Sequence, residues 1–196
     1  MYNDLSKAVD TTIELVSDIK KSKDIVLISI DGMSGSGKST FARILSSELN
    51  ATLIRCDDFF LRPEQRTEER LRTPGGNLDT ERLLSEVIKP IFAEKSFVYR
   101  PFNCHIMDFD ETLIITPADV VVLEGSYSCH PELYDFFDIH IFLSTDRLTQ
   151  VSRILLREGY NKTKIFIEKW IPVDTREKIP SYSKIKPIYH LYPTLN

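Results

Sequence analysis

The sequence lacks the features that mark a disulfide-stapled, fibrous or membrane-spanning protein. Its 196 residues include three widely spaced cysteines and no CxxC pair, a pattern typical of free thiols in a reducing compartment. Seven glycines and ten prolines without a short period exclude a collagen-like or low-complexity chain. The apolar runs, such as residues 25–30 and 120–123, are far shorter than the roughly 18 residues of a membrane-spanning helix. The first ten residues do not resemble a signal peptide, so we expect a cytoplasmic protein that does not contact a membrane.

An excess of positive charge is also missing. The chain has 25 Lys and Arg against 29 Asp and Glu, a net charge of −4, whereas domains that bind a nucleic-acid backbone are usually basic. Hydrophobic residues make up 42% and charged residues 28%, which is the composition of an ordinary globular domain. The length predicts one domain spanning residues 1–196, and the charge favours a small molecule over a nucleic acid as its partner.

Hydrophobic patterning predicts strands that alternate with helices. Strands buried on both faces are expected at three places: the continuous apolar run 25–30, and residues 118–125 and 138–144. Shorter strands are expected at three others: 51–55, 97–99 and 112–115. Helical spacing of apolar residues occurs over five segments: 5–19, 39–49, 83–91 (stopping near Pro90), 146–158 and 162–171. A long loop over 61–78 and an irregular tail after Pro172 complete the prediction of an α/β fold with a mainly parallel sheet.

Residues 32–39 read GMSGSGKS, which matches the P-loop pattern G-x-x-x-x-G-K-[ST]. Glycines let such a loop point its N–H groups at phosphate oxygens, and the following helix presents its positive N-terminal end to the same anion. Lys38 supplies a cation for the β- and γ-phosphates, and Ser39 offers a hydroxyl to Mg²⁺. The pattern lies between a predicted strand and a predicted helix, as this mechanism requires. The expected nucleotide-binding residues are Gly32, Met33, Ser34, Gly35, Ser36, Gly37, Lys38, Ser39 and Thr40.

Carboxylates follow two of the predicted strands. Asp57 and Asp58 come after the strand at 51–55, and Glu124 ends the run VVVLE in the manner of a Walker B acid. Carboxyl ends of parallel strands line the crevice of such sheets, where an acid can accept a proton or help to hold Mg²⁺. Strand alternation predicts that Asp57 faces the same side as Arg55, and that Asp58 faces the other side and caps the next turn. The alternatives are a purely capping acid and, for Glu124, a solvated strand end.

Three arginines lie on the predicted helix 146–158. Arg153 and Arg157 are four residues apart and share a face, and Arg147 is at the start of the helix. Such side chains can fold over phosphates as a lid and neutralise charge in the transition state. A solvated basic face is the alternative interpretation.

Several motifs occur together over residues 25–160, namely IDGMSGSGKST, CDDFF, GGNLDTERL, YRPFNCH and VVLEGSYSCHPEL. Their order and spacing resemble the uridine kinase family, within the wider uridine kinase and phosphoribulokinase group of P-loop kinases. The resemblance implies a three-layer α/β/α P-loop NTPase domain with a helical lid. The helix within residues 1–23 and the segment 161–196 resemble the family less closely. Relatives of this kind are often oligomers, so the resemblance also raises the prospect of a homo-oligomer.

The resemblance implies roles for four residues on the acceptor side. Asp57 matches the general base that activates a ribose 5′-hydroxyl, and Asp79 in GGNLD matches an acid that binds the ribose hydroxyls. Tyr99 and His105 match an aromatic residue and a histidine that hold a pyrimidine base. From the sequence alone, Asp79 would instead be a helix N-cap and His105 a structural histidine.

On the donor side, the resemblance implies that Glu124 is the Mg²⁺-associated acid and that Arg153 and Arg157 are lid arginines. It therefore predicts a pyrimidine-salvage kinase that transfers the γ-phosphoryl group of ATP or GTP, with Mg²⁺, to the 5′-hydroxyl of uridine or cytidine. Asp58 and the Arg157-Glu158 pair depart from the family pattern. These departures leave open a kinase for pantothenate, glycerate or nicotinamide riboside. A nucleotide-dependent switch or ATPase is the alternative from another class.

Overall fold

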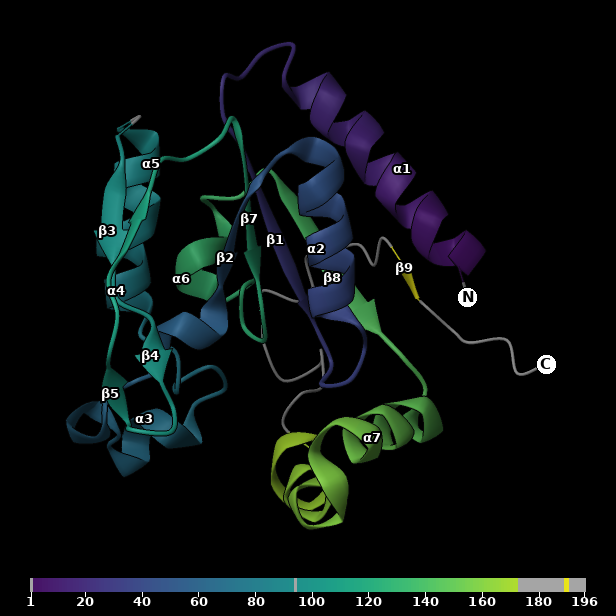
Figure 1. Cartoon of the computed structure of the whole chain (residues 1–196), viewed down its shortest axis with the longest axis vertical. Coiled ribbons are helices and arrows are strands. Elements are labelled where there is room, and N and C mark those ends of the chain that lie inside the picture. The colour runs from purple at the N-terminus through teal and green to yellow at the C-terminus, as the bar shows by residue number, and fades with distance from the viewer. Residues whose placement is uncertain (1, 94, 173–188, 191–196) are drawn as a thin grey trace.

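The structure, a computed structural model, describes residues 2–93, 95–172 and 189–190. Figure 1 shows a central sheet with helices on both faces. The sheet has the strand order β2-β7-β1-β8-β9, and every neighbouring pair is parallel. Its strands are β1 (Val26–Gly32), β2 (Thr52–Arg55), β7 (Val120–Glu124), β8 (Ile139–Ser144) and β9 (Tyr189–His190). The predicted α/β class with a parallel sheet is confirmed.

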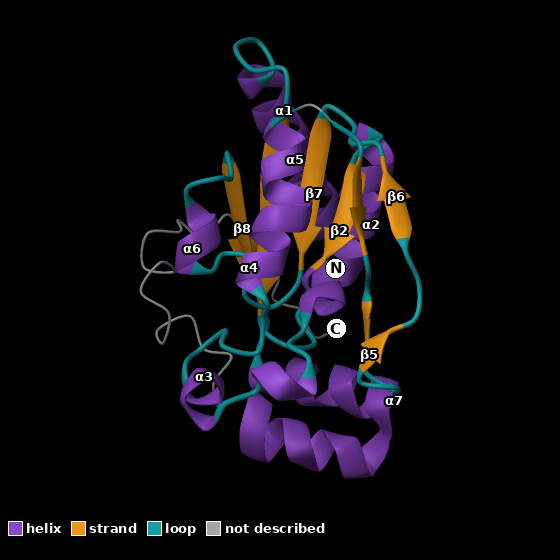
Figure 2. Cartoon of the chain, turned by 90° about the vertical axis from the view of Figure 1, so that its left-hand side faces the viewer, coloured by secondary structure: helices purple, strands orange, loops and turns teal. Residues whose placement is uncertain are grey.

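Helices pack on both faces of this sheet and make the three layers (Figures 1 and 2). Helices α1 (Tyr2–Ile19) and α2 (Lys38–Leu49) cover one face. The opposite face is covered by α4 (Thr80–Leu83), η3 (Leu84–Ile88), α5 (Lys89–Phe92) and α6 (Pro131–Tyr134). No helix among the described residues is both long and apolar enough to cross a membrane.

The central strands are apolar on both sides because each face of the sheet has its own core. In β1, Val26, Ile28 and Ile30 pack with α1 and α2, whereas Leu27 points into the core under α4 and α5. The strand β7 alternates in the same way. Successive strand residues point to opposite faces, so a strand with two buried faces needs an unbroken apolar run.

The chain between β2 and β7 builds a smaller lobe beside the sheet. Two short antiparallel ribbons lie here: β3 (Phe97–Tyr99) with β6 (Leu113–Ile115), and β4 (Phe102–Asn103) with β5 (Asp108–Phe109). The preceding segment contains the turns η1 (Cys56–Phe59) and η2 (Pro63–Gln65) and the short helix α3 (Glu68–Arg72). The long connection predicted over 61–78 is therefore present, with one helical turn in α3.

The predicted helix end near Pro90 is confirmed, because the helical path passes through the proline and ends at Phe92. A proline lacks the N–H group and crowds the carbonyl four residues earlier. The chain takes up this misfit in the π-helical turn η3, where the N–H of Lys89 reaches back to the carbonyl of Leu84.

Helix α7 (Arg147–Ile165) follows β8 and continues into the π-helical turn η4 (Phe166–Trp170). Its helical path breaks at Gly159, which has φ 76° and ψ 172°, so the predicted helices at 146–158 and 162–171 are found on either side of the break. Figure 1 shows α7 below the carboxyl ends of the strands, the place of a lid. Most of the predicted irregular tail lies outside the described residues, but residues 189–190 form β9 against β8, so an irregular tail is wrong there.

Candidate active site

The P-loop connects β1 to α2 at the carboxyl edge of the sheet (Figure 1). Gly32 has φ +148°, and a Cβ there would lie 2.1 Å from the carbonyl oxygen of Leu143 in β8, so no side chain fits. Gly37 has φ +101° and stands at the N-cap of α2 without a side-chain cap. The first amides of α2 are thus left for another acceptor, which is the arrangement that binds a phosphate.

Two cations reach the carbonyl groups of this loop. Lys38 Nζ donates hydrogen bonds to the carbonyls of Gly32 at 2.9 Å and Met33 at 3.1 Å. Arg153 Nη1, from α7, donates to the carbonyls of Gly35 at 3.1 Å and Ser36 at 3.2 Å. The first half of the lid helix is therefore fastened to the P-loop, and positive charge lies where donor phosphates would bind.

A serine and a glutamate meet beside the loop. Ser39 Oγ donates to Glu124 Oε1 at 3.0 Å, and Glu124, at the end of β7, is 6% exposed. Burial raises the pKa of Glu124, while the nearby Lys38 charge opposes that rise. Hard oxygen donors of this kind suit Mg²⁺, which is usually held by one or two protein oxygens together with nucleotide phosphates. The residues present therefore fit the ion.

Asp57 and Asp58 occupy different environments. Asp57 is exposed, whereas Asp58 is 4% exposed and accepts hydrogen bonds from Arg55 Nη2 at 2.7 Å and from the Tyr99 hydroxyl at 3.1 Å. Burial raises the pKa of Asp58, and both donors oppose that rise. The negative charge of Asp57 also raises the pKa of Glu124, although burial is the larger cause. The charge of the exposed Asp57 thus reaches Glu124, and a role of Asp57 as general base stays a prediction.

The alternation predicted for this segment is wrong. Strand β2 ends at Arg55, and residues 56–59 turn into the 3₁₀ helix η1. In a 3₁₀ helix, residues three apart lie one above the other, so Arg55 pairs with Asp58 rather than sharing a side with Asp57. Asp58 does not cap the next turn; instead it connects β2 to β3 by accepting hydrogen bonds from Arg55 and Tyr99.

The predicted acceptor residues do not all come together. Asp79 is the N-cap of α4, accepting from the N–H of Arg82 at 3.0 Å, and its other oxygen accepts from Gln65 Nε2 at 2.9 Å. Its own N–H donates to the carbonyl of Phe59 at 2.7 Å, which holds it beside η1. The alternative prediction of an N-cap is confirmed, and a ribose contact stays a prediction.

Tyr99 lies in the core and is 4% exposed, with its ring 5.1 Å from the Phe59 ring and its hydroxyl on Asp58. This placement favours a structural role, and a base contact by Tyr99 stays a prediction. His105 is exposed in the connection between β4 and β5, where its backbone N–H donates to Asn103 Oδ1 at 2.8 Å. A base contact by His105 stays a prediction.

The lid arginines also differ in their surroundings. Arg153 contacts the P-loop, whereas Arg157 is exposed and ion-pairs with Glu158 at 2.9 Å, and Arg147 bonds to Gln150 at 3.3 Å. Arg157 lies just before the break at Gly159. A phosphate contact by Arg157 therefore stays a prediction, and the alternative of a solvated basic face fits Arg147.

Sequence reasoning missed Asp31. This carboxylate is 2% exposed and accepts from the N–H groups of Gly32 at 2.6 Å, Tyr127 at 3.1 Å and Cys129 at 3.0 Å. It joins the start of the P-loop to the segment that follows Glu124. The available signal was an acid directly after the apolar run 25–30, where a buried charge needs partners.

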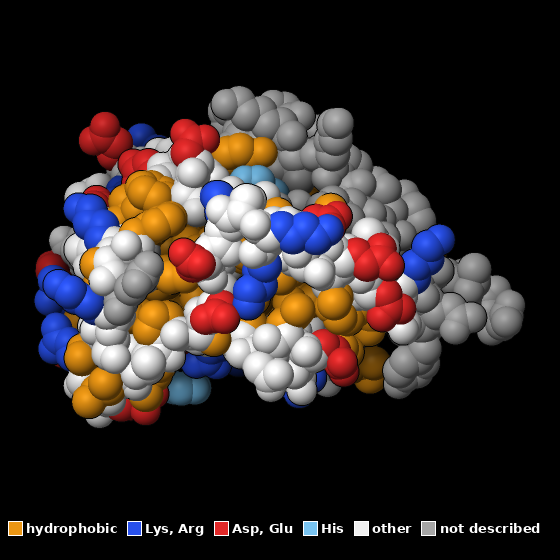
Figure 3. Space-filling view, turned by 90° about the horizontal axis from the view of Figure 1, so that it is seen from above, with side chains coloured by type: hydrophobic (Ala, Val, Ile, Leu, Met, Phe, Trp, Pro, Cys, Tyr) orange, Lys and Arg blue, Asp and Glu red, His pale blue; other side chains and the backbone are white. Residues whose placement is uncertain are grey.

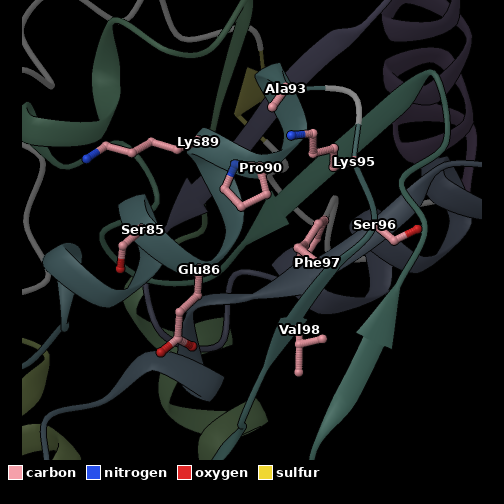
Figure 4. Close-up of a pocket in the computed structure, with 9 residues that line it drawn as sticks. All are labelled: Ser85, Glu86, Lys89, Pro90, Ala93, Lys95, Ser96, Phe97 and Val98. Atoms are coloured by element: carbon pink, nitrogen blue, oxygen red, sulfur yellow. The ribbon is translucent and has the colours of Figure 1, made fainter.

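A surface hollow between α5 and β3 lies apart from this site (Figure 4). None of the predicted site residues lines it. Its lining consists of Ser85, Glu86, Lys89, Pro90, Ala93, Lys95, Ser96, Phe97 and Val98. Figure 3 views the molecule from above, the end away from the P-loop, where acidic and basic side chains are interspersed.

The fold and the P-loop with its serine–glutamate pair define a P-loop nucleotide-binding protein. A family model described as "AAA domain" matches residues 28–177. The uridine kinase of Alkaliphilus metalliredigens (strain QYMF) is 31% identical over 147 residues, which is 68% of each chain. The uridine kinase of Clostridium tetani (strain Massachusetts / E88) is 30% identical over 155 residues, covering 70% of this chain and 69% of the relative.

The chain therefore belongs to the uridine kinase family of P-loop kinases, nucleotide-using phosphotransferases that act on an alcohol group. Solved structures agree on the fold. D-glycerate 3-kinase from Cryptococcus neoformans var. grubii serotype A superposes with a TM-score of 0.65 at 14% identity, covering 91% of this chain and 89% of that one.

Proposed function

We propose that this kinase transfers the γ-phosphoryl group of ATP or GTP to the 5′-hydroxyl of uridine or cytidine. The observation that carries the proposal is the exposed Asp57 carboxylate, whose charge reaches Glu124, the hydrogen-bond partner of Ser39 beside the P-loop. Support for the acceptor comes from the uridine kinases that are 31% identical to this chain over 147 residues and 30% identical over 155 residues.

Each of these residues has one task. The amides of residues 34–39 and Lys38 hold the donor phosphates, and Arg153 holds the loop that presents those amides. Ser39 and Glu124 would hold Mg²⁺, which when bound neutralises charge on the β- and γ-phosphate oxygens. Asp57 accepts the proton of the acceptor hydroxyl. The oxygen of that hydroxyl bonds to the γ-phosphorus, and the bond between this phosphorus and the oxygen of the leaving nucleoside diphosphate breaks. The products are ADP, or GDP when GTP is the donor, and the nucleoside monophosphate.

A kinase for another small hydroxyl metabolite is the second candidate. The observation that favours it is Tyr99, whose ring is packed in the core rather than open to a base. The shared fold with a D-glycerate 3-kinase is compatible with this candidate.

ADP release measured with and without each acceptor tests the proposal. We expect slow release with ATP and Mg²⁺ alone and fast release when uridine or cytidine is added. Lys38→Ala should lower kcat/KM by about 10²–10³-fold, because it removes a preorganised charge from the phosphates, and circular dichroism should show an intact fold. Fast release without an acceptor would indicate an ATPase or switch, and release that responds only to a non-nucleoside alcohol would support the second candidate.

A further inference from the structure

Arg55 is the last residue of β2 and lies at the carboxyl edge of the sheet, beside the acids of the site. In the parallel register of β2 with β7, its partner is Glu124. Side chains at paired positions of neighbouring strands leave the same face of a sheet. The two residues are therefore direct neighbours, although they are far apart in the sequence.

The face that both residues share is the one covered by α2. Leu53, two positions before Arg55, packs against the core under α1 and α2. Val122, two positions before Glu124, lies in the same core. Alternation along each strand thus directs Arg55 toward the side on which Ser39, at the start of α2, donates to Glu124.

Three carboxylates lie within electrostatic reach of the Arg55 guanidinium. Asp58 Oδ1 accepts from Arg55 Nη2 at 2.7 Å, and this ion pair is the main reason why the pKa of Arg55 is raised. The charge of Asp57 raises it further. The positive charge of Arg55 in turn opposes the burial that raises the pKa of Glu124. Arg55 is therefore the cation that links the metal-binding acid to the two adjacent aspartates.

Most donors of Arg55 are unused. Its side chain is 62% exposed, and the bond from Nη2 to Asp58 is its one side-chain hydrogen bond within the described part of the chain. The Nε and Nη1 donors are thus available to a ligand at the carboxyl edge of the sheet. An ion pair of so exposed an arginine contributes little to stability, so stability gives this position little reason to hold a guanidinium.

The other cations near the P-loop are engaged with protein groups. Lys38 and Arg153 donate to carbonyl groups of the loop, and Arg157 is paired with Glu158. During phosphoryl transfer, negative charge spreads over the three equatorial oxygens of the group that moves from donor to acceptor. A cation with unused donors, next to the acids of the site, can bond to those oxygens.

We propose that Arg55 is a further catalytic residue, which donates hydrogen bonds from Nε and Nη1 to the transferring phosphoryl group. The acceptor oxygen bonds to the γ-phosphorus as the bond to the leaving nucleoside diphosphate breaks; Asp57 takes the acceptor proton, and Arg55 keeps all of its protons. The planar guanidinium fork matches two oxygens of a phosphoryl group. The inference rests on the proposed function for the role of Asp57, but Arg55 acts on the phosphoryl group whichever alcohol receives it.

Replacing the guanidinium tests the proposal. Arg55→Gln should lower kcat with uridine about 10²–10³-fold, the usual effect of removing a preorganised donor from developing charge. The KM values of ATP and uridine should change less than about threefold, because the lost contact is made in the transition state. Arg55→Lys keeps the charge without the planar fork and should recover part of the loss.

Asp58→Asn is the matched control, because it breaks the same ion pair from the other side and leaves the guanidinium in place. If the pair only holds β2 in place, the two variants should lose kcat alike. If Arg55 contacts the phosphoryl group, Arg55→Gln should lose far more turnover than Asp58→Asn. Its loss of Tm should be no greater, because Asp58→Asn also weakens the bond to Tyr99.

Calorimetric titration with Mg²⁺, ADP and aluminium fluoride gives a readout that does not depend on turnover. The fluoride complex mimics the transferring phosphoryl group, and the wild type and Asp58→Asn should bind ADP more tightly in its presence. Arg55→Gln should lose about 10–100-fold of that affinity, the usual weight of a hydrogen bond to a charged group. The Kd of ADP alone should not change.

Equal losses of kcat in Arg55→Gln and Asp58→Asn, or fluoride-dependent binding that is indifferent to Arg55, would overturn the proposal. The slow release of ADP without an acceptor should require Arg55 as well, because the same phosphoryl group is then transferred to water. A protein that does not phosphorylate uridine, while that release and the fluoride-dependent binding both require Arg55, would refute the proposed function alone.

Discussion

Replacing each of the two adjacent aspartates by asparagine separates a catalytic carboxylate from a structural one. The substitution keeps the shape of the side chain and removes its charge. Asp57→Asn should lower kcat by about 10²–10⁴-fold, the usual size of a lost general base. The free energy of unfolding should stay nearly unchanged, because Asp57 is exposed.

The Asp58→Asn variant should behave in the opposite way. An asparagine has one acceptor oxygen, so it can serve either Arg55 or Tyr99, and its amide N–H₂ then faces the other donor. A hydrogen bond to a charged group contributes about 1.5–3 kcal/mol. The Arg55 side chain is 62% exposed, so water compensates for much of that loss, and we expect about 1–2 kcal/mol of destabilisation.

Two assays decide between these outcomes. For a chain of this size, 1 kcal/mol lowers Tm by about 2–4 °C, so Asp58→Asn should melt about 2–8 °C below wild type while its kcat falls far less than that of Asp57→Asn. Kd for ATP should be near normal in both variants. If Asp58→Asn abolishes turnover and Asp57→Asn does not, the base has been assigned to the wrong carboxylate.

Two further predictions concern the P-loop and the metal side. Gly32→Ala should destabilise the fold by more than about 4 kcal/mol, because the new Cβ would collide with a β8 carbonyl. The Cβ of Gly159→Ala meets nothing within 4 Å, so this variant should cost about 1–2 kcal/mol of backbone strain. Urea unfolding compares the two variants, and equal losses of stability would contradict the steric reasoning. Burial raises the pKa of Glu124 above its ordinary 4.5, so native stability falls as pH rises through that raised value. Glu124→Gln should therefore raise Tm at about pH 7 but not at about pH 4. A Tm difference that does not depend on pH would contradict this stability prediction. The same variant should lower Mg²⁺-dependent turnover.

Local patterns predicted the sheet because its strands obey simple rules. The runs at 25–30, 118–125 and 138–144 are found within one or two residues of β1, β7 and β8, since strands buried on two faces must be apolar throughout. The P-loop was equally predictable, because its glycines and Lys38 are required locally by the backbone and by the phosphate.

Contacts between distant segments could not be predicted in this way. The partnership of Asp58 with Tyr99 joins residues 41 positions apart, and no periodicity reports it. The end of β2 at Arg55 was also decisive, because the expected alternation requires the strand to continue through Asp58. The π-helical turn just before Pro90 is a third feature that no sequence pattern indicated.

Asp31 makes two loops share one anchor. Its carboxylate accepts hydrogen bonds from the N–H of Gly32 and from the N–H groups of Tyr127 and Cys129. These bonds fix the length of the segment 125–129, so an inserted residue cannot be accommodated there without breaking them. A residue added there would pull amides off the carboxylate and disturb the entrance of the P-loop. Changes in chain length are therefore better tolerated in the connection 61–78 and in the β4–β5 hairpin, which do not share this anchor.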